Sequence, residues 1–115
     1  MELKEGMYAR TEDGEILKIK HIEDVYTSDG IYIANVIYFG DCFHINSDEV
    51  IKASHNIIDL IEVGDYVNGF QVVNKKDNII CVIKLIIPSD LKEEDIKSIV
   101  TKEMFANAEY RMETN

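Results

Sequence analysis

The sequence predicts a mainly β fold, a small SH3-like barrel or sandwich of about six to eight short strands with one or two short helices. Turn-forming residues recur at short intervals, as in Glu12-Asp13-Gly14, Asp29-Gly30 and Asn68-Gly69. The segments between them are rich in β-branched and aromatic residues. Signals for helices are few and short, so strands should form most of the core.

The size and composition favour one compact domain over residues 1–115. The chain has 115 residues, of which 46% are apolar, and a single proline. Such a chain buries enough apolar surface to fold without a disulfide or a metal. A half-boundary is expected near residues 54–63, where a polar stretch and an apolar cluster interrupt the strand pattern.

The first half should contain a main β-hairpin. Residues 16–22 alternate in polarity, which places Leu17, Ile19 and His21 on one face of a half-buried strand. This position makes His21 a core or rim histidine. Residues 31–39 are apolar on both faces, as in a central strand, and Asp29-Gly30 provides the hairpin turn.

In the second half, residues 79–87 repeat this strand character and end at Pro88. Proline cannot donate to a strand ladder, so it marks an edge or a strand end. Asp90 to Glu93 have the spacing of a capping box, which predicts a turn or two of helix at most.

The C-terminal part should contain a second short helix. Thr101 is placed to cap a helix over residues 102–107, with Met104 and Phe105 pointing inward. A last strand is expected at residues 109–112.

Two segments share a Gly-x-Tyr core. Residues 5–10 and 63–68 both carry it, and each is followed by a turn and a β-prone run. Both segments should enter strands. The chain is therefore either two related β-units or one unit with a chance echo, because the match is short compared with genuine repeats.

Charge narrows the class of partner. The 22 acidic and 12 basic residues give a formal net charge of −10, which repels nucleic acid phosphates. The acidity either serves solubility or forms a face that docks on a basic protein surface. We expect a protein partner and no direct nucleic-acid contact, and a homo-oligomer stays open.

The chain is expected in the cytoplasm with both thiols reduced. Only two cysteines are present, and the N-terminal residues do not have the pattern of a secretory signal. The longest apolar run, at residues 79–83, is far below the roughly 20 residues that a membrane helix needs.

Four side chains are candidates for metal binding or thiol chemistry. Cys42 and His44 are two residues apart and face the same way on a strand, and His55 and Cys81 complete a four-ligand set on paper. Structural zinc sites use paired ligands in two close clusters, a spacing that this sequence lacks. We expect no metal; a small metal- or thiol-dependent enzyme centred on Cys42, His44 and His55 is the alternative.

The other polar residues do not support a catalytic function. Ser54 and His55 are adjacent and lack an orienting third group, so Ser54 or Asn56 more simply caps a helical turn over residues 57–61. No glycine-rich phosphate loop is present, so no nucleotide cofactor is expected. Some of the six tyrosines are binding candidates and the others core residues. The carboxylates lack a calcium-loop pattern and are candidates for partner binding: Asp41, Asp48, Glu49, Asp59, Glu62 and Asp65.

Three blocks carry a resemblance to a known group of proteins. They are SHNIIDLIEVGDYVNG at residues 54–69, IKSIVTKEMF at residues 96–105 and EGMYART at residues 5–11. The chain resembles small proteins of unassigned function from prophages and mobile elements of Gram-positive bacteria. The resemblance implies a bacterial cytosol during phage replication or host takeover, and it supplies no catalytic residues.

These observations favour a non-enzymatic protein-binding module of a phage or mobile element. A more specific version is an inhibitor that offers carboxylates to the basic groove of a host nucleic-acid-processing or defence enzyme. The alternatives are the small enzyme named above and a structural or assembly protein of the virion.

Overall fold

The protein is mainly β and divides into two compact units. The computed structural model describes residues 2–40 and 43–108. Within this part, 49% is strand and there is one short α-helix. One unit runs up to Leu60 and the other begins at Ile61. This division lies inside the stretch 54–63, where the sequence suggested a half-boundary. The mainly β class is confirmed, and the assignment of one domain stays a prediction.

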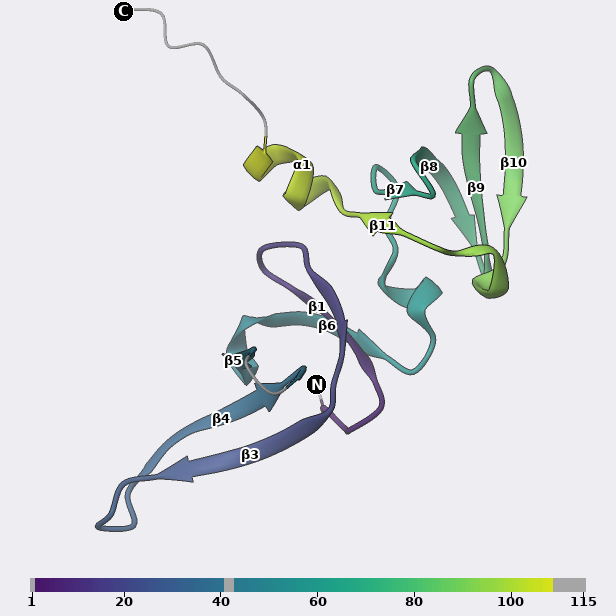
Figure 1. Cartoon of the computed structure of the whole chain (residues 1–115). Helices are drawn as coiled ribbons and strands as arrows, with labels where there is room; N and C mark the ends of the chain where they lie inside the picture. The colour runs from purple at the N-terminus through teal and green to yellow at the C-terminus, as the bar shows by residue number, and fades with distance from the viewer. Residues whose placement is uncertain (1, 41–42, 109–115) are drawn as a thin grey trace, which may run out of the picture. The chain divides into compact units, whose positions relative to one another are not determined.

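The N-terminal unit contains two three-stranded antiparallel sheets (Figure 1). In the first sheet the central strand β1 pairs with β2 and β6, and in the second the central strand β4 pairs with β3 and β5. The strands are β1 (Tyr8–Thr11), β2 (Ile16–Lys18), β3 (His21–Tyr26), β4 (Tyr32–Tyr38), β5 (His44–Asn46) and β6 (Val50–Ser54).

The C-terminal unit contains one five-stranded antiparallel sheet in the order β10-β9-β8-β7-β11. Within the described residues none of the three sheets closes on itself, so the finer class of barrel or sandwich stays a prediction. The elements are β7 (Tyr66–Val67), β8 (Phe70–Lys76), β9 (Ile79–Lys84), β10 (Ile87–Leu91), β11 (Ile99–Val100) and α1 (Lys102–Ala108).

The two units share the placement of their first and last strands. In each, the first strand lies between the next strand and the last one: β1 between β2 and β6, and β7 between β8 and β11. The remaining strands differ, because β3, β4 and β5 form a separate sheet in the N-terminal unit whereas β9 and β10 continue the sheet from β8 in the C-terminal unit. In each unit a 3₁₀ turn precedes the last strand. These turns are η1 (Ser47–Glu49) and η3 (Glu93–Asp95). The two Gly-x-Tyr segments lead into the corresponding first strands, β1 and β7, so the expected strand entries are confirmed.

Buried apolar side chains hold each unit together. In the N-terminal unit, Ala9, Ile19, Ile37 and Val50 form a buried cluster against which partly buried neighbours such as Met7 and Ile22 pack. The buried side chains of the C-terminal sheet are Val67, Val72, Ile80, Val82 and Leu91. Ile80 and Val82 occupy alternate positions of β9, as the period of a strand requires, and the other three come from β7, β8 and β10.

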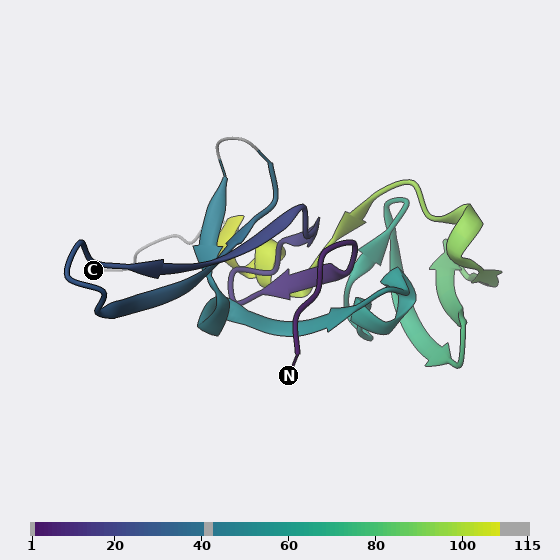
Figure 2. The same ribbon diagram turned by 90° about the horizontal axis from the view of Figure 1, so that it is seen from below.

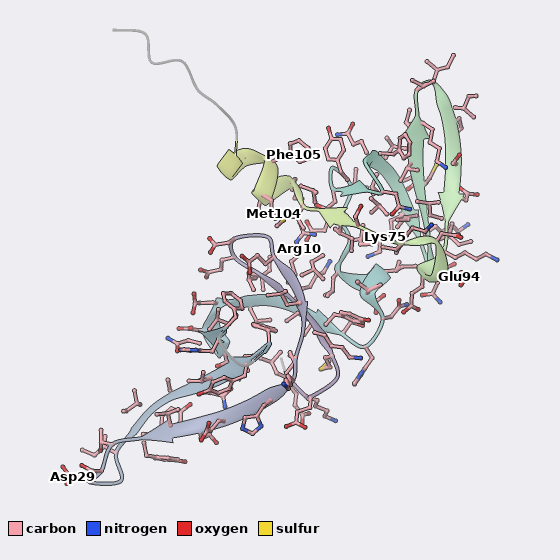
Figure 3. All side chains as sticks on the ribbon, in the orientation of Figure 1. Arg10, Asp29, Lys75, Glu94, Met104 and Phe105 are labelled. Atoms are coloured by element: carbon pink, nitrogen blue, oxygen red, sulfur yellow. The ribbon has the colours of Figure 1, made fainter. Side chains whose placement is uncertain are left out.

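The expected caps are present. The side-chain oxygen of Asn56 accepts from the backbone N–H of Ile58 at 3.1 Å, at the start of η2 (Ile57–Leu60). The hydroxyl oxygen of Thr101 accepts from the N–H of Met104 at 3.3 Å at the start of α1. Phe105 is 48% exposed, so its inward orientation is wrong. Its ring packs on that of Tyr66 instead, with ring centroids 4.4 Å apart. Figure 3 labels Phe105. The strand expected at 109–112 lies outside the described residues.

The single strand expected over residues 16–22 is wrong. The N–H of Ile19 donates to Met7 at 2.7 Å, whereas the N–H of Lys20 donates to Tyr38 at 2.8 Å. The chain therefore passes from one sheet to the other between these residues, and the polarity alternation does not continue across the break. Ile19 is buried, but the side chain of His21 is 55% exposed and does not belong to the core.

The strand expected over residues 79–87 is a hairpin instead. β9 ends at Lys84, β10 begins at Ile87, and Leu85-Ile86 form the two-residue turn. Leu85 has a φ of 61°, a left-handed conformation that glycine or asparagine normally supplies, so turn chemistry gave no signal here. Pro88 lies in β10 at the edge of the sheet, where proline is tolerated.

Asn68 connects the β7–β8 turn to a distant segment of the C-terminal unit. Asn68 and Gly69 both have positive φ, as a type I′ turn requires. The side-chain oxygen of Asn68 accepts from the N–H of Lys97 at 2.8 Å and of Ser98 at 3.1 Å. Its side-chain nitrogen donates to the carbonyl of Asp95 at 2.7 Å. One side chain thus holds the segment that leads into β11.

The variant Asn68→Ala should lower the free energy of unfolding by about 2–3 kcal/mol, because it removes three hydrogen bonds and strains a left-handed position. Asn68→Gly is the matched control, since it removes the same bonds but keeps the conformation, and it should cost less. Urea denaturation measures both, and amide exchange at Lys97 and Ser98 should accelerate. Equal stability of wild type and Asn68→Ala would contradict this role.

Candidate partner-binding surface

The candidates for metal or thiol chemistry lie in separate elements. His44 begins β5, His55 is exposed after β6, and Cys81 is partly buried in β9 of the other unit. Cys42 and Asp41 lie outside the described residues. In residues 2–40 and 43–108, no three His, Cys, Asp or Glu side chains are grouped so that they could hold a metal ion.

His44 belongs instead to an aromatic row across the second sheet. The strand register places His21 of β3, Tyr38 of β4 and His44 of β5 directly beside one another. The ring centroids of His21 and Tyr38 are 5.8 Å apart, and those of Tyr38 and His44 are 5.4 Å apart. The Nδ1 atom of His21 also lies 3.2 Å from a carboxylate oxygen of Glu5. This row covers part of the sheet surface.

Most of the carboxylates proposed for partner binding have structural contacts. Glu49 accepts from the N–H of Asn46 at 2.8 Å, and Asp59 accepts from the hydroxyl of Ser54 at 2.6 Å. Glu62 forms an ion pair with Lys102 at 2.7 Å. Asp48 is exposed in η1 and is the described candidate best placed to meet a partner.

Asp65 is fully buried and joins two parts of the C-terminal unit that are far apart in sequence. Its Oδ2 accepts from the N–H of Glu62 at 2.7 Å, and its Oδ1 accepts from the N–H of Lys102 at 3.0 Å. The carboxylate therefore holds the chain before β7 against the first residue of α1. A buried carboxylate in this position stabilises the fold and is not available to a partner.

The pair of Lys102 and Glu62 reinforces the same connection. The hydrogen bond to Glu62 raises the pKa of Lys102 above its usual 10.5, and the negative charges of Glu62, Glu103 and Asp65 add to the effect. Gly64, just before Asp65, has a φ of 100°, a backbone conformation that favours glycine.

One part of the N-terminal unit has an unusual charge distribution that the composition alone did not reveal. Residues 21–51 contain no lysine or arginine. They cover β3, β4, β5, η1 and the start of β6, and we call this region the acidic sheet. A count of charges along the chain would have found it. Its described acidic residues are Glu23, Asp24, Asp29, Asp48 and Glu49.

The end of the β3–β4 hairpin combines this charge with exposed apolar side chains. Figures 1 and 2 show the hairpin extending beyond the other strands of its unit, and Figure 3 labels Asp29 at its end. Tyr26 and Tyr32 pack edge to face with ring centroids 5.5 Å apart. The side chains that are more than half exposed are Tyr26, Ile31, Tyr32 and Ile33. We call these four residues the apolar hairpin end.

A shallow hollow adjoins the apolar hairpin end. It has a volume of about 240 Å³ and lies between β4 and the start of η1. Its lining combines apolar atoms with amide, hydroxyl and carboxylate groups from Tyr32, Ile33, Ala34, Asn35, Asn46, Ser47 and Asp48.

A second exposed apolar group lies in the C-terminal unit. Leu85 and Ile86 of the β9–β10 turn are 92% and 91% exposed, and Ile87 follows at 64%. The hairpin from residue 78 to residue 89 contains no acidic residue and a single lysine, Lys84. This hairpin therefore lacks the negative charge that characterises the acidic sheet.

Comparisons with protein-family models, curated proteins and solved structures find no match for this chain. Among the described residues there is no helix of the length and hydrophobicity needed to cross a membrane.

The variant Asp65→Ala should lower the free energy of unfolding by about 3 kcal/mol, because two backbone amides lose a buried charged acceptor. Asp59→Ala, which removes an exposed carboxylate, is the control and should cost about 1 kcal/mol or less. Urea denaturation measures the difference, and amide exchange at Lys102 identifies its origin. Equal effects of the two variants would contradict the role of Asp65.

Alkaline pH should weaken the C-terminal unit slightly. Because the pKa of Lys102 is raised in the folded state, its stabilisation is complete below about 10.5 and is lost as the pH rises through the folded-state pKa. The pair is partly exposed, so we expect less than about 1 kcal/mol. Glu62→Gln should reduce this alkaline loss, measured by urea denaturation on both sides of pH 10.5. An unchanged loss would show that another group titrates.

Proposed function

We propose that this protein is a non-enzymatic protein-binding module of a phage or mobile element. The observation that carries the proposal is the acidic sheet, a stretch of 31 residues (21–51) without lysine or arginine that ends in an exposed apolar hairpin. Large exposed apolar side chains next to one another are typical of protein contact sites.

The charge of the acidic sheet favours a basic partner. A one-signed surface attracts the opposite sign, raises the association rate and makes binding sensitive to salt. Basic grooves of this kind occur in enzymes that bind nucleic acids, since phosphates require lysine and arginine. The specific version is an inhibitor of a host nucleic-acid-processing or defence enzyme in the bacterial cytoplasm, with the acidic sheet occupying that groove.

We also infer that the two units are related SH3-like folds. Support comes from the shared placement of the first and last strands, the 3₁₀ turn before each last strand and the Gly-x-Tyr core before each first strand. A duplication would leave one unit free to acquire a binding surface while the other kept the ancestral fold. The long β3–β4 hairpin belongs to the N-terminal unit, which is where we place binding.

A second candidate function is a structural or assembly protein of the virion. The exposed turn at Leu85 and Ile86 favours it, because apolar side chains at a sheet edge promote self-association. Sedimentation at increasing protein concentration tests this alternative, and a monomer throughout would exclude it.

Capture from host lysate at low and high salt tests the main proposal. Tagged wild type should retain a basic protein at low salt and release it at high salt. The variant Glu23→Gln/Asp29→Asn/Asp48→Asn removes three charges from the acidic sheet and should retain at most about a tenth as much.

The control variant Asp90→Asn/Glu93→Gln/Glu94→Gln removes the same charge from the C-terminal unit and should bind like wild type. Loss of binding in both variants would show that net charge alone attracts the partner. If wild type retains no host protein at low salt, the proposed function is wrong.

A further inference from the structure

We infer that the apolar hairpin end docks a basic protein segment that carries an apolar side chain. This inference rests on the proposed function and adds the chemistry of the partner: positive charge for the acidic sheet, and an apolar anchor for Tyr26, Ile31, Tyr32 and Ile33.

The four side chains at the hairpin end are not needed by the core of their unit. All are more than half exposed, although β4 buries Val36 and Ile37 farther along the same hairpin. Exposed strand positions are ordinarily polar. The turn is held by Gly30 at positive φ and by hydrogen bonds of Thr27 to the backbone of Gly30 and Ile31, none of which needs an apolar side chain. Apolar residues on both sides of the turn therefore provide a surface for something outside the chain.

Charge selects the occupant. A bilayer surface and a nucleic acid are both anionic, and both would be repelled by carboxylates such as Glu23, Asp24 and Asp29. A second copy of this chain carries a net charge of −10, and its acid-free hairpin offers only Lys84 as a basic group. A foreign segment rich in lysine or arginine matches the sheet on charge.

The geometry adds the need for an apolar anchor. The edge-to-face pair of Tyr26 and Tyr32 forms a firm apolar platform, because each ring restrains the other. The hollow of about 240 Å³ beside Tyr32 and Ile33 can receive one medium-sized side chain, and the carboxylate of Asp48 lies at its lining. Tyrosine rings also stack with guanidinium groups, which favours arginine beside the anchor.

Two synthetic peptides of equal length and equal arginine and lysine content test the inference on the full chain. One has leucine at its central positions and the other has serine. Calorimetry should show that the leucine peptide binds at least about tenfold more tightly, as loss of an anchor in a buried contact typically costs this much. Its addition should shift the NMR signals of Tyr26, Ile31, Tyr32 and Ile33.

Matched variants locate the contact. Tyr32→Ser/Ile33→Ser should bind the leucine peptide at least about tenfold more weakly and the serine peptide as wild type does. Leu85→Ser/Ile86→Ser removes a similar exposed apolar pair from the other unit and should change neither affinity. NMR spectra confirm that both variants fold.

The outcomes separate the inference from the proposed function. Equal binding of the two peptides would refute the anchor while leaving charge-driven binding intact. A loss that follows Leu85→Ser/Ile86→Ser instead of Tyr32→Ser/Ile33→Ser would also overturn the inference. If neither peptide binds at low salt, both the inference and the basic-partner proposal fail.

Discussion

The buried carboxylate of Asp65 is the contact on which the C-terminal unit depends. Its strands β7 and β11 have two residues each, so strand pairing alone provides few hydrogen bonds there. Asp65 and Asn68 supply further connections. Asp65 accepts from the distant N–H of Lys102 as well as from the nearby N–H of Glu62, and Asn68 accepts from the distant N–H groups of Lys97 and Ser98. Two blocks of sequence far apart in the chain, GDYVNG and SIVTKEMF, are thereby joined into one structural motif.

The structural contacts of individual carboxylates change how the acidity of the chain should be interpreted. Glu49, Asp59, Glu62 and Asp65 looked alike in sequence as surface charges, yet each has a defined structural contact. We therefore assign partner binding to the other carboxylates of the acidic sheet, such as Asp29 and Asp48.

Local signals predicted a large part of the structure. The caps at Asn56 and Thr101, the hairpin turn at Asp29-Gly30 and the central strand after it follow from interactions within a few residues, which sequence shows directly. The errors share one cause. The break after Ile19 follows from the pairing of its two sides with different sheets, and the turn at Leu85-Ile86 from the pairing of β9 with β10. Neither position has a glycine or a proline to signal it.

The sequence by itself determined the mainly β class, the positions of most turns and the charge that disfavours nucleic acid. Only the tertiary structure decided which side chains meet. Asp65 reaches Lys102 across 37 positions, and His44 packs on Tyr38, which also contacts His21. The physical reason is that periodicity and turn propensity act over a few residues, whereas burial and long-range hydrogen bonds depend on how strands are ordered in a sheet.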